Sequence, residues 1–466
     1  MISMTLAELA EVVGGSVHGP GDLVVSAPAY VDSRTPVAGG LFVAIVGERS
    51  DGHDHVADAH AVLGSRPTDR PTVVVADPVT ALGRLARHVV DRLTAQGLTV
   101  LALTGSQGKT GTKDYLASVL SAVVGPEAVV ATTANNNNEL GVPLTALRAT
   151  THTRHLVLEM GARGVGHIAY LCGIAPPRIS GVLNVGSAHI GEFGGREAIA
   201  QAKGEIVEAL PAEGVAVLNA DDALVAAMVP RTPARVLTFG SAGEVAWRDL
   251  ELDELGRPSF TLSMGESDHR VVLLQTGAHQ AANAAAAAAF AVAAGLEPAD
   301  IARALGEARS ASPWRMEVSE RSDGLVVIND SYNANPESMR AALSALVAVG
   351  ERSGRRTLAV LGEMRELGDE HEAGHRAVGS AAAELGVDVL VVVDDSVAPF
   401  AAGVDSTETE IVLTSGKEQA GAWLRQNAGP RDVVLVKASR GAALERIAEQ
   451  LLASADVPDQ PEENPT

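Results

Sequence analysis

The sequence predicts an α/β protein built from two or three domains. Its 466 residues exceed the roughly 250 to 300 residues at which a single hydrophobic core usually stops growing. From about residue 98 onward, short apolar runs typical of strands alternate with helix-like stretches. This alternation favours mostly parallel sheets covered by helices on both faces. Hydrophobic residues make up 46% of the chain and charged residues 20%, which is the composition of a globular protein.

The N-terminal domain, residues 1–82, should be a small α/β module. It contains a short helix after Thr5 and small strands such as 40–46, and Asp77-Pro78 marks a turn near its end. The central domain, residues 83–312, should alternate helices with apolar strands. Its expected helices are 79–96, 113–123 and 281–294, and its expected strands are 98–103, 155–159, 179–185 and 215–218.

A C-terminal domain, residues 313–453, should follow the break at Pro313. Its expected strands, separated by helical stretches, are 325–329, 357–361, 387–393 and 432–436. The tail, residues 454–466, is rich in proline and acidic residues and cannot bury enough apolar area to order itself. We therefore expect a disordered tail.

Charge and cysteine content exclude several classes of protein. The formal net charge of −22 argues against nucleic acid and anionic membranes as partners. The single cysteine, Cys172, excludes an intramolecular disulfide framework, and its apolar neighbours favour a buried thiol. We find no signal peptide pattern and no apolar run close to the roughly 20 residues of a membrane span. A cytoplasmic protein without membrane insertion is expected.

The strongest local signal is Thr104-Gly-Ser-Gln-Gly-Lys109-Thr110, between a predicted strand and a predicted helix. Glycines there let backbone amides close around phosphate oxygens, Lys109 supplies a positive charge, and Thr110 can reach a magnesium ion. The longer-spaced form of this loop would have a glycine at position 103, where the chain has Leu103. A tight turn without a ligand is the alternative interpretation.

Candidate metal ligands follow the loop. Glu159 ends a predicted core strand, where open α/β sheets bind their ligands. His189 and Lys203 follow in Asn-Val-Gly-Ser-Ala-His189 and Ala-Lys203-Gly-Glu. Alone, the histidine would more often be structural and the lysine solvated, because magnesium prefers oxygen ligands. A deprotonated Lys203 can, however, take up carbon dioxide and become a carbamate, which offers oxygen atoms to a metal.

Taken together, these segments resemble the Mur ligase family. The motifs occur in the order of that family over nearly the whole chain; they are the shortened phosphate loop, Glu159-Met-Gly, Asn-Val-Gly-x-Ala-His189, Ala-Lys203-x-Glu, Gly-Ala-His-Gln-Ala-Ala-Asn283, Trp314-Arg315 and Asn-Asp330-Ser-Tyr-Asn333. The resemblance implies a small N-terminal domain for a UDP-linked substrate, a central P-loop domain for ATP, and a C-terminal Rossmann-like domain.

The resemblance also implies roles for individual residues. Asn283 is expected at the adenine, Arg315 at the terminal phosphate and Asp330 on the nucleotide side of the C-terminal domain. The residues expected to bind ATP are Gly105, Ser106, Gln107, Gly108, Lys109, Thr110, Gly111, Asn283, Arg315 and Asp330. The residues expected to hold two magnesium ions are Thr110, Glu159, His189 and a carbamylated Lys203. The residues expected to take part in catalysis are Lys109, Glu159, His189, Lys203 and Arg315.

Two segments indicate which members of the family are most similar. Asp330-Ser-Tyr-Asn-Ala-Asn335-Pro336 and Leu361-Gly-Glu-Met-Arg resemble the enzymes that add D-alanyl-D-alanine to UDP-N-acetylmuramoyl-tripeptide. Asn333 and Asn335 are accordingly expected near substrate. Asn335 can also cap a helix that Pro336 opens, and capping is most of the role we expect for it.

Two N-terminal segments are expected to contact the UDP-linked substrate. Val31-Asp-Ser33-Arg34 resembles the UDP-binding segment of the family, with Ser33 and Arg34 as the contacts, although such a pair is more often a surface loop. Residues 135–138 resemble the substrate-recognition loop, with Asn137 as the contact, and a polar turn is the alternative.

The resemblance implies a reaction in which ATP phosphorylates the tripeptide carboxylate and the amine of D-alanyl-D-alanine attacks the acyl phosphate. Positioning and charge neutralisation are sufficient for the phosphoryl step, so no reactive cysteine is needed. A monomer is expected. The alternatives are a related ligase that adds a diamino acid or glutamate, and a P-loop nucleotide switch without ligase activity. The Asp330–Pro336 segment argues against the related ligases.

Overall fold

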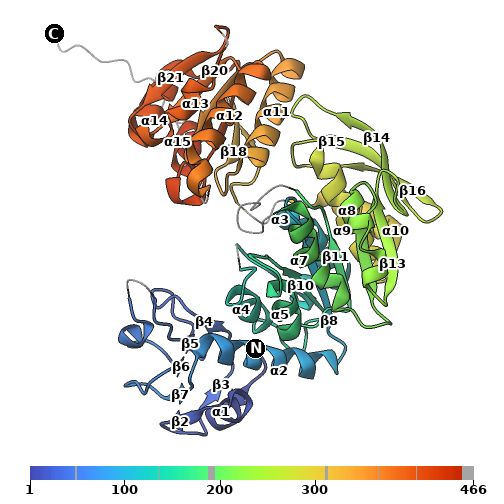
Figure 1. The fold of residues 1–466 in the computed structure, drawn as a ribbon, viewed down its shortest axis with the longest axis vertical. Coiled ribbons are helices and arrows are strands. Elements are labelled where there is room, and N and C mark those ends of the chain that lie inside the picture. The colour runs from blue at the N-terminus through green and yellow to red at the C-terminus, as the bar shows by residue number, and fades with distance from the viewer. Residues whose placement is uncertain are drawn as a thin grey trace, which may run out of the picture. The chain divides into compact units, whose positions relative to one another are not determined.

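The computed structural model describes residues 1–47, 50–134, 136–186, 195–309, 313–365, 367–405 and 407–453. It contains an N-terminal five-stranded sheet, a central nine-stranded sheet and a C-terminal six-stranded sheet, each with helices (Figure 1). The predicted α/β class is therefore confirmed. The predicted tail, 454–466, and residue 312, the predicted end of the central domain, lie outside the described residues.

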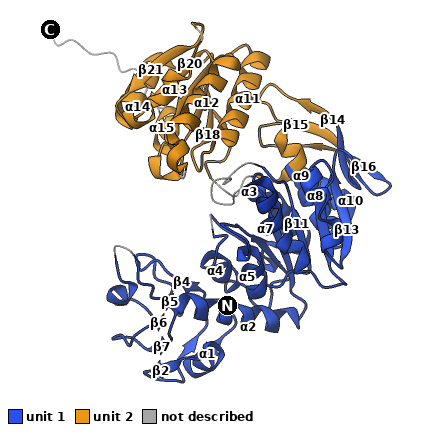
Figure 2. Ribbon diagram, in the orientation of Figure 1, with its two compact units in different colours: residues 1–248, 262–269, 283–305 blue, residues 249–261, 270–282, 306–466 orange. Residues whose placement is uncertain are grey.

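The described chain forms two compact units (Figure 2). The first comprises Met1–Arg248, Leu262–His269 and Asn283–Leu305, and the second comprises the rest. The division into three domains remains a prediction. Its first boundary, residue 82, lies inside a single helix, α2 (Pro78–Thr94).

The N-terminal module surrounds the five-stranded sheet, in the order β2-β7-β6-β5-β4. The strands from β4 to β7 pair in parallel, and β2 joins β7 antiparallel. Its elements are β1 (Met4–Thr5), α1 (Leu6–Val13), β2 (Ser16–His18), β3 (Val24–Val25), β4 (Ala29–Tyr30), β5 (Leu41–Val43), the 3₁₀ helix η1 (Gly52–His55), β6 (Ala61–Gly64) and β7 (Thr72–Val74).

Helix α2 joins this module to the central sheet. Asp77 caps it through a hydrogen bond from the Val79 amide, and Pro78 is its first residue, so the dipeptide that suggested a turn begins a helix instead. Its apolar residues are buried. They pack against α1, β5 and β6 and also against α4 (Gly141–Ala146) and α5 (His167–Ile174).

The central sheet has the strand order β16-β15-β14-β13-β12-β11-β8-β10-β9. From β9 to β13 every neighbouring pair is parallel. Its elements are β8 (Thr99–Thr104), α3 (Lys109–Val124), η2 (Pro126–Ala128), β9 (Val129–Ala131), α4, β10 (His155–Glu159), α5, β11 (Ile179–Val182), α7 (Arg196–Glu208), β12 (Val215–Asn219), α8 (Ala223–Ala226), η3 (Val229–Arg231), β13 (Arg235–Gly240), β14 (Val245–Leu252), β15 (Pro258–Met264), β16 (Ser267–Val272), α9 (His279–Ala293) and α10 (Pro298–Glu307).

The strands β13 to β16 are absent from the sequence prediction, and the β15–β16 pair makes the sheet mixed. Only Gly265 and Glu266 separate β15 from β16. So short a connection allows an antiparallel hairpin and excludes a parallel crossover. β15 alternates buried and half-buried residues along its length, which is the period-two pattern of a strand with one covered face.

The C-terminal sheet has the order β17-β18-β22-β19-β20-β21, and its pairs are parallel except for the edge strand β17. Separate apolar clusters lie on its two faces, one with α11 and α12 and the other with α14 and α15. Its elements are β17 (Glu317–Glu320), β18 (Val326–Asp330), α11 (Pro336–Ser353), β19 (Arg356–Leu361), η4 (Gly368–Glu370), α12 (His371–Glu384), β20 (Val389–Val393), η5 (Asp395–Val397), α13 (Pro399–Ala402), β21 (Glu410–Thr414), α14 (Lys417–Asn427), β22 (Asp432–Lys437), η6 (Arg440–Ala442) and α15 (Glu445–Ala453).

Two other sequence expectations have clear outcomes. Cys172 is buried, and burial raises the pKa of its thiol to about 12, so its packing interpretation is supported. None of the helices in the described parts of the chain is long and apolar enough to cross a membrane.

Candidate active site

The predicted phosphate loop connects the end of β8 to the start of α3. Gly108 has a φ of 76°, and a Cβ atom there would lie 2.5 Å from the Asn283 side-chain oxygen. Glycine is therefore required both by the left-handed backbone and by the close approach of α9. The structure thus brings Asn283, the predicted adenine contact, against the loop. Helix α3 begins at Lys109, four residues before the predicted start, because this glycine ends the loop.

Lys109 folds back over the same loop. Its Nζ donates to the Gly105 carbonyl at 2.7 Å and lies 3.4 Å from the Ser106 carbonyl. The first amides of a helix have no partner within the helix, and its N-terminus carries partial positive charge. The loop, the lysine and the helix start together form an anion site of the kind that binds phosphate.

Glu159, at the end of β10, lies beside the loop and is 2% exposed. Its carboxylate accepts one hydrogen bond from the Thr110 hydroxyl and another from the Asn137 amide, each at 2.9 Å. The Glu159 backbone amide donates to the Thr132 hydroxyl at 3.0 Å. Thr110 and Glu159 thus present neighbouring oxygens, which suit magnesium. Asn137, the predicted substrate contact, holds this carboxylate.

Lys203 lies on α7 and is only 7% exposed. Burial, and to a smaller extent the positive charge of Lys109, together lower the pKa of its amine to about 7. Two lysine charges that influence each other favour an anion between or beside them. Glu205, two residues on, accepts from the Gly166 and Ala169 amides at the start of α5. Glu205 is therefore a structural cap.

The rest of the predicted metal set has a mixed outcome. His189 lies outside the described residues. The described part of the chain contains no group of three or more histidine, cysteine, aspartate or glutamate side chains placed so that they could hold a metal ion. A threonine hydroxyl and a single carboxylate are not such a group. The oxygens of Thr110 and Glu159 nevertheless fit a magnesium ion, because magnesium prefers oxygen ligands.

In the second unit, Asp330 ends β18 and organises its surroundings. Its carboxylate accepts from the Lys437 Nζ at 2.6 Å and from the Met316 amide at 3.1 Å. Lys437 also donates to the backbone carbonyl of Asn333 at 2.8 Å. Lys437 is fully enclosed, at 2% exposure, so this buried pair holds the loop after β18 in place.

Arg315 lies on a strained segment. Its neighbours Trp314 and Met316 have φ values of 60° and 48°, which cost about 1 to 3 kcal/mol each for such residues. The guanidinium lies 4.2 Å from the centre of the Tyr332 ring, within cation–π range. Its buried Nε has no hydrogen-bond acceptor in the described part of the chain. A buried donor without an acceptor fits the predicted contact with a phosphate.

Asn335 caps α11. Its side-chain oxygen accepts from the Ser338 amide at 2.8 Å, and the Ser338 hydroxyl accepts from the Asn335 amide at 3.0 Å. Pro336 is the first helical residue. The reciprocal bonds form a capping box, as the capping interpretation expects.

Comparisons with known proteins decide the family. The Mur ligase middle domain matches residues 103–291, and the Mur ligase glutamate ligase domain matches residues 314–440.

The chain belongs to the Mur ligase family.

Members of that family named for D-alanyl-D-alanine addition are similar over almost their whole length. The UDP-N-acetylmuramoyl-tripeptide–D-alanyl-D-alanine ligase of Mycobacterium tuberculosis is 43% identical, over 97% of this chain and 98% of its own. The ligase of the same name from Escherichia coli is 35% identical, over 97% and 99%.

Solved Mur ligase structures agree. MurF from Acinetobacter baumannii has a TM-score of 0.85 at 33% identity, covering 97% of this chain and 99% of its own. MurF from Thermotoga maritima, solved in complex with ADP, has a TM-score of 0.77 at 31% identity, covering 93% and 99%. A diaminopimelate-adding ligase is only 18% identical, with a TM-score of 0.56, and this likeness shows the fold alone. The family prediction is confirmed.

The predicted UDP contacts of this Mur ligase lie on an exposed turn between β4 and β5. The Arg34 side chain is 86% exposed and pairs with Asp32, with 2.7 Å between the guanidinium and the carboxylate. This partner lowers the pKa of Asp32 to about 2. Ser33 lies on the same turn. Their substrate role remains a prediction.

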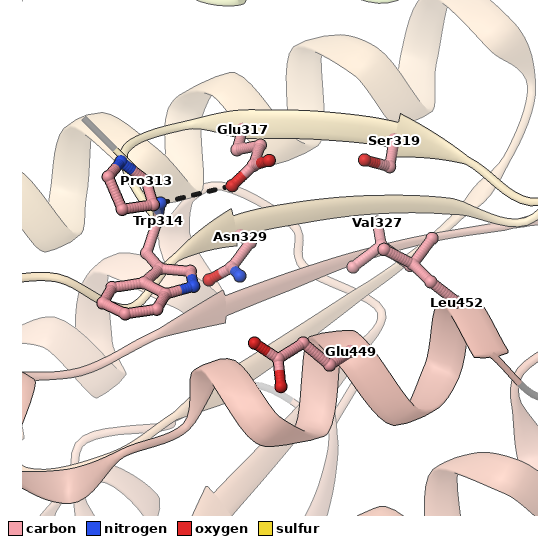
Figure 3. Close-up of a pocket in the computed structure, with 8 residues that line it drawn as sticks. All are labelled: Pro313, Trp314, Glu317, Ser319, Val327, Asn329, Glu449 and Leu452. Carbon is pink, nitrogen blue, oxygen red and sulfur yellow. Dashed lines mark hydrogen bonds between the residues drawn. The ribbon is translucent and has the colours of Figure 1, made fainter. Parts of the chain in front are cut away.

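A pocket of about 170 Å³ lies in the second unit of this Mur ligase (Figure 3). Trp314, Glu317 and Asn329 line it, and the Glu449 carboxylate of α15 faces it. None of the predicted site residues lines this pocket. It therefore neighbours the Arg315 segment without being the predicted nucleotide site.

One residue at the phosphate loop is missing from the sequence prediction. Asn184 follows β11 and accepts hydrogen bonds from two amides of the loop. In its motif, Asn-Val-Gly-Ser-Ala-His189, the sequence pattern points to the histidine as the candidate ligand. Strand β11 ends at Val182, three residues before the predicted end, so Asn184 belongs to a loop and is not part of the strand.

Proposed function

We propose that this chain is the ATP-dependent ligase that joins D-alanyl-D-alanine to UDP-N-acetylmuramoyl-tripeptide. The products are the UDP-linked pentapeptide, ADP and phosphate, which is a step of peptidoglycan precursor synthesis. Its similarity along nearly its full length to ligases of that name supports this assignment. We place the enzyme in the cytoplasm, as a monomer.

The observation that carries the proposal is the buried arrangement of Thr110, Asn137 and Glu159 beside Lys109. A carboxylate held by two donors, one of them Thr110 at the end of the phosphate loop, provides oxygen ligands next to an anion site. Nucleotide hydrolysis alone would also use such a site. The similarity to peptide ligases over 97% of the chain favours ligation over a nucleotide switch.

The reaction has two steps. A carboxylate oxygen of the tripeptide attacks the γ-phosphorus of ATP, the bond to the β-phosphate oxygen breaks, and ADP leaves. The amine of D-alanyl-D-alanine then attacks the acyl carbon, loses a proton, and displaces phosphate. Lys109 and the α3 amides hold the phosphates, and Arg315 neutralises charge on the transferred group.

Magnesium would be held by Thr110 and Glu159, with His189 and Lys203 as the further predicted ligands. When bound, the metal ions neutralise phosphate charge. The buried amine of Lys203, whose pKa is lowered to about 7, is in part neutral near pH 7 and can react with carbon dioxide. The carbamate would replace a positive charge by a negative one, beside Lys109, and so supply a metal ligand.

The test is reconstitution with purified protein. Reactions would contain ATP, magnesium, D-alanyl-D-alanine and a UDP-muramoyl-tripeptide that ends in either lysine or diaminopimelate. We expect a pentapeptide by mass spectrometry and phosphate release only when acceptor and amine are both present. Release that is independent of both would indicate a nucleotide switch. The comparison of the two tripeptides identifies the third residue of the natural substrate.

A further inference from the structure

Asn184 makes an unusually complete set of contacts with the phosphate loop. Its side-chain oxygen accepts from the backbone amides of Ser106 and Gln107, both at 2.9 Å. Its side-chain nitrogen donates to the Gln107 carbonyl at 3.1 Å. Its backbone carbonyl lies 3.2 Å from the Ser106 amide. One asparagine side chain thus pairs with two backbone amides and one backbone carbonyl at the tip of the loop.

The segment that carries Asn184 is itself anchored. Asn219 donates to the Leu183 carbonyl at 2.7 Å, and Asp222 accepts from the Val185 amide at 2.8 Å. Arg196, at the start of α7, donates to the Val185 carbonyl at 2.9 Å. The three anchoring side chains come from the end of β12, the cap of α8 and α7. The segment 183–186 is therefore a fixed support and not a mobile loop resting on its neighbour.

The backbone packing agrees with this interpretation. A Cβ atom on Gly105 would lie 2.9 Å from the Leu183 Cβ, and one on Gly186 would lie 3.1 Å from the Ser106 Cβ. The Gly186 amide also donates to the Ser106 hydroxyl at 2.9 Å. Two glycines, one in each segment, allow this close approach of the two backbones.

These contacts explain how a shortened phosphate loop can work. Because Asn184 occupies the amides of residues 106 and 107, the amides left for a phosphate are those at the start of α3. In the longer form of the loop, additional residues before the helix wrap the phosphates. Here Leu103 is a buried strand residue, and no such wrap is available. Support from the segment 183–186, which follows strand β11, replaces it.

We propose that Asn184 is a positioning residue for ATP, which holds the phosphate loop so that the α3 amides and Lys109 face the phosphates. The proposal rests on the proposed function, because it assigns the loop to ATP. It differs from a second interpretation, in which the Asn184 oxygen stands in the place of a phosphate oxygen and must leave when nucleotide binds. The two interpretations predict opposite changes in nucleotide affinity.

The test compares Asn184→Ala with Ser180→Ala. Ser180 lies on β11, is buried, and donates to the Ile206 carbonyl at 2.7 Å. Its variant therefore loses a buried hydrogen bond of the strand that precedes Asn184, and this bond does not involve the phosphate loop. ADP affinity is measured by calorimetry without other substrates. For Asn184→Ala we expect about tenfold weaker binding, equivalent to about 1.4 kcal/mol, and for Ser180→Ala no more than about a twofold change.

Two further measurements separate positioning from general stability. Amide hydrogen exchange in the peptide containing Ser106 and Gln107 should be faster in Asn184→Ala and unchanged in Ser180→Ala. In steady-state ligation, the Michaelis constant for ATP should rise while those for the UDP-linked substrate and D-alanyl-D-alanine change less than about twofold.

Each outcome decides the proposal. Unchanged ADP affinity and exchange in Asn184→Ala would contradict it. Tighter ADP binding would also overturn it and favour the interpretation in which the oxygen blocks the site. A loss of affinity of equal size in Ser180→Ala would assign the effect to stability alone. If the wild-type protein binds ADP but makes no pentapeptide, the ligase assignment fails while the role of Asn184 is still measured.

Discussion

The phosphate-loop region and the Asp32–Arg34 turn both carry charged residues assigned to anionic substrates, yet they are built in opposite ways. At the loop, Glu159 and Lys203 are buried, and the Ser106 and Gln107 amides of the loop tip both donate to the Asn184 side chain. At the turn, Arg34 is 86% exposed and its partner, Asp32, is 41% exposed.

The two regions differ in when their side chains lose conformational entropy. A buried site held by hydrogen bonds is already ordered before the reacting groups bind. This suits a reaction step that depends on alignment and charge. An exposed arginine loses side-chain entropy only when its ligand binds. We therefore expect substitutions at the first region to reduce turnover and those at the second to reduce affinity for one substrate.

The largest effect is expected from Lys109→Ala. It removes the charge nearest the phosphates while leaving the loop amides bound to Asn184, so the fold should persist. Ligation should fall by about 10³-fold or more. Circular dichroism and pentapeptide formation would be measured together. Retained turnover in a folded variant would contradict the nucleotide assignment.

Lys203 tests whether the buried site needs a negative charge. Lys203→Ala should lose about 100-fold or more of the activity, and a short carboxylic acid in solution should restore part of it. Lys203→Arg should stay inactive, because it keeps a positive charge and cannot form a carbamate.

The wild-type enzyme provides a pH test of the same idea. Only the neutral amine of Lys203 reacts with carbon dioxide, and its pKa is lowered to about 7. Activity should therefore fall as pH drops below about 7 and when dissolved carbon dioxide is removed, and bicarbonate should restore it. Near-normal turnover in Lys203→Arg would contradict carbamylation and indicate that Lys203 is an ordinary helix lysine.

Arg34→Ala should have a smaller and selective effect. It removes an exposed cation from the turn assigned to the UDP-linked substrate. The Michaelis constant for that substrate should rise about 10- to 100-fold, as expected for a hydrogen bond between charged groups, while that for ATP stays nearly constant. An equal rise for both substrates would place the UDP site elsewhere and remove the contrast between the two regions.

The smallest effect is expected from Asp32→Asn. Exposed ion pairs contribute little to stability because water and salt screen them. The melting temperature should stay unchanged, and the Michaelis constant for the UDP-linked substrate should change by less than about threefold. A marked loss of thermal stability would show that the turn is as firmly built as the loop.

Sequence patterns predicted the parts of the fold that have strong periodicity. Strand β10 matches the expected range 155–159 in full, because its three central residues, 156–158, are apolar and buried. The sequence pattern does not predict strands β13 to β16, because β14, for example, carries exposed polar residues such as Arg248 and Asp249. Their order depends on pairing with neighbours that the local sequence does not specify.

The site shows the same limit. Lys109, Thr110 and Glu159 could be found because phosphate and magnesium demand particular residue types at strand ends. Asn184 could not be assigned, because its task is defined by two amides 78 and 77 residues away in the chain. The strained φ values at Trp314 and Met316 likewise have no sequence signature, and Met316 bonds to Asp330 at the end of β18, 14 residues away in the chain.

Helix α2 limits how the family can exchange parts by recombination. Its residues Leu82, Leu85 and Val89 are fully buried, and the helix packs on elements of both the N-terminal and the central sheet. A crossover at residue 82 would combine parts of the helix from two parents, and would place mismatched side chains in the apolar cluster that the N-terminal module shares with the central sheet. Crossovers beyond Thr94 transfer the helix whole, so its contacts with α1 are kept and its contacts with α4 and α5 must be matched. Inheritance of the N-terminal module should therefore carry α2 with it.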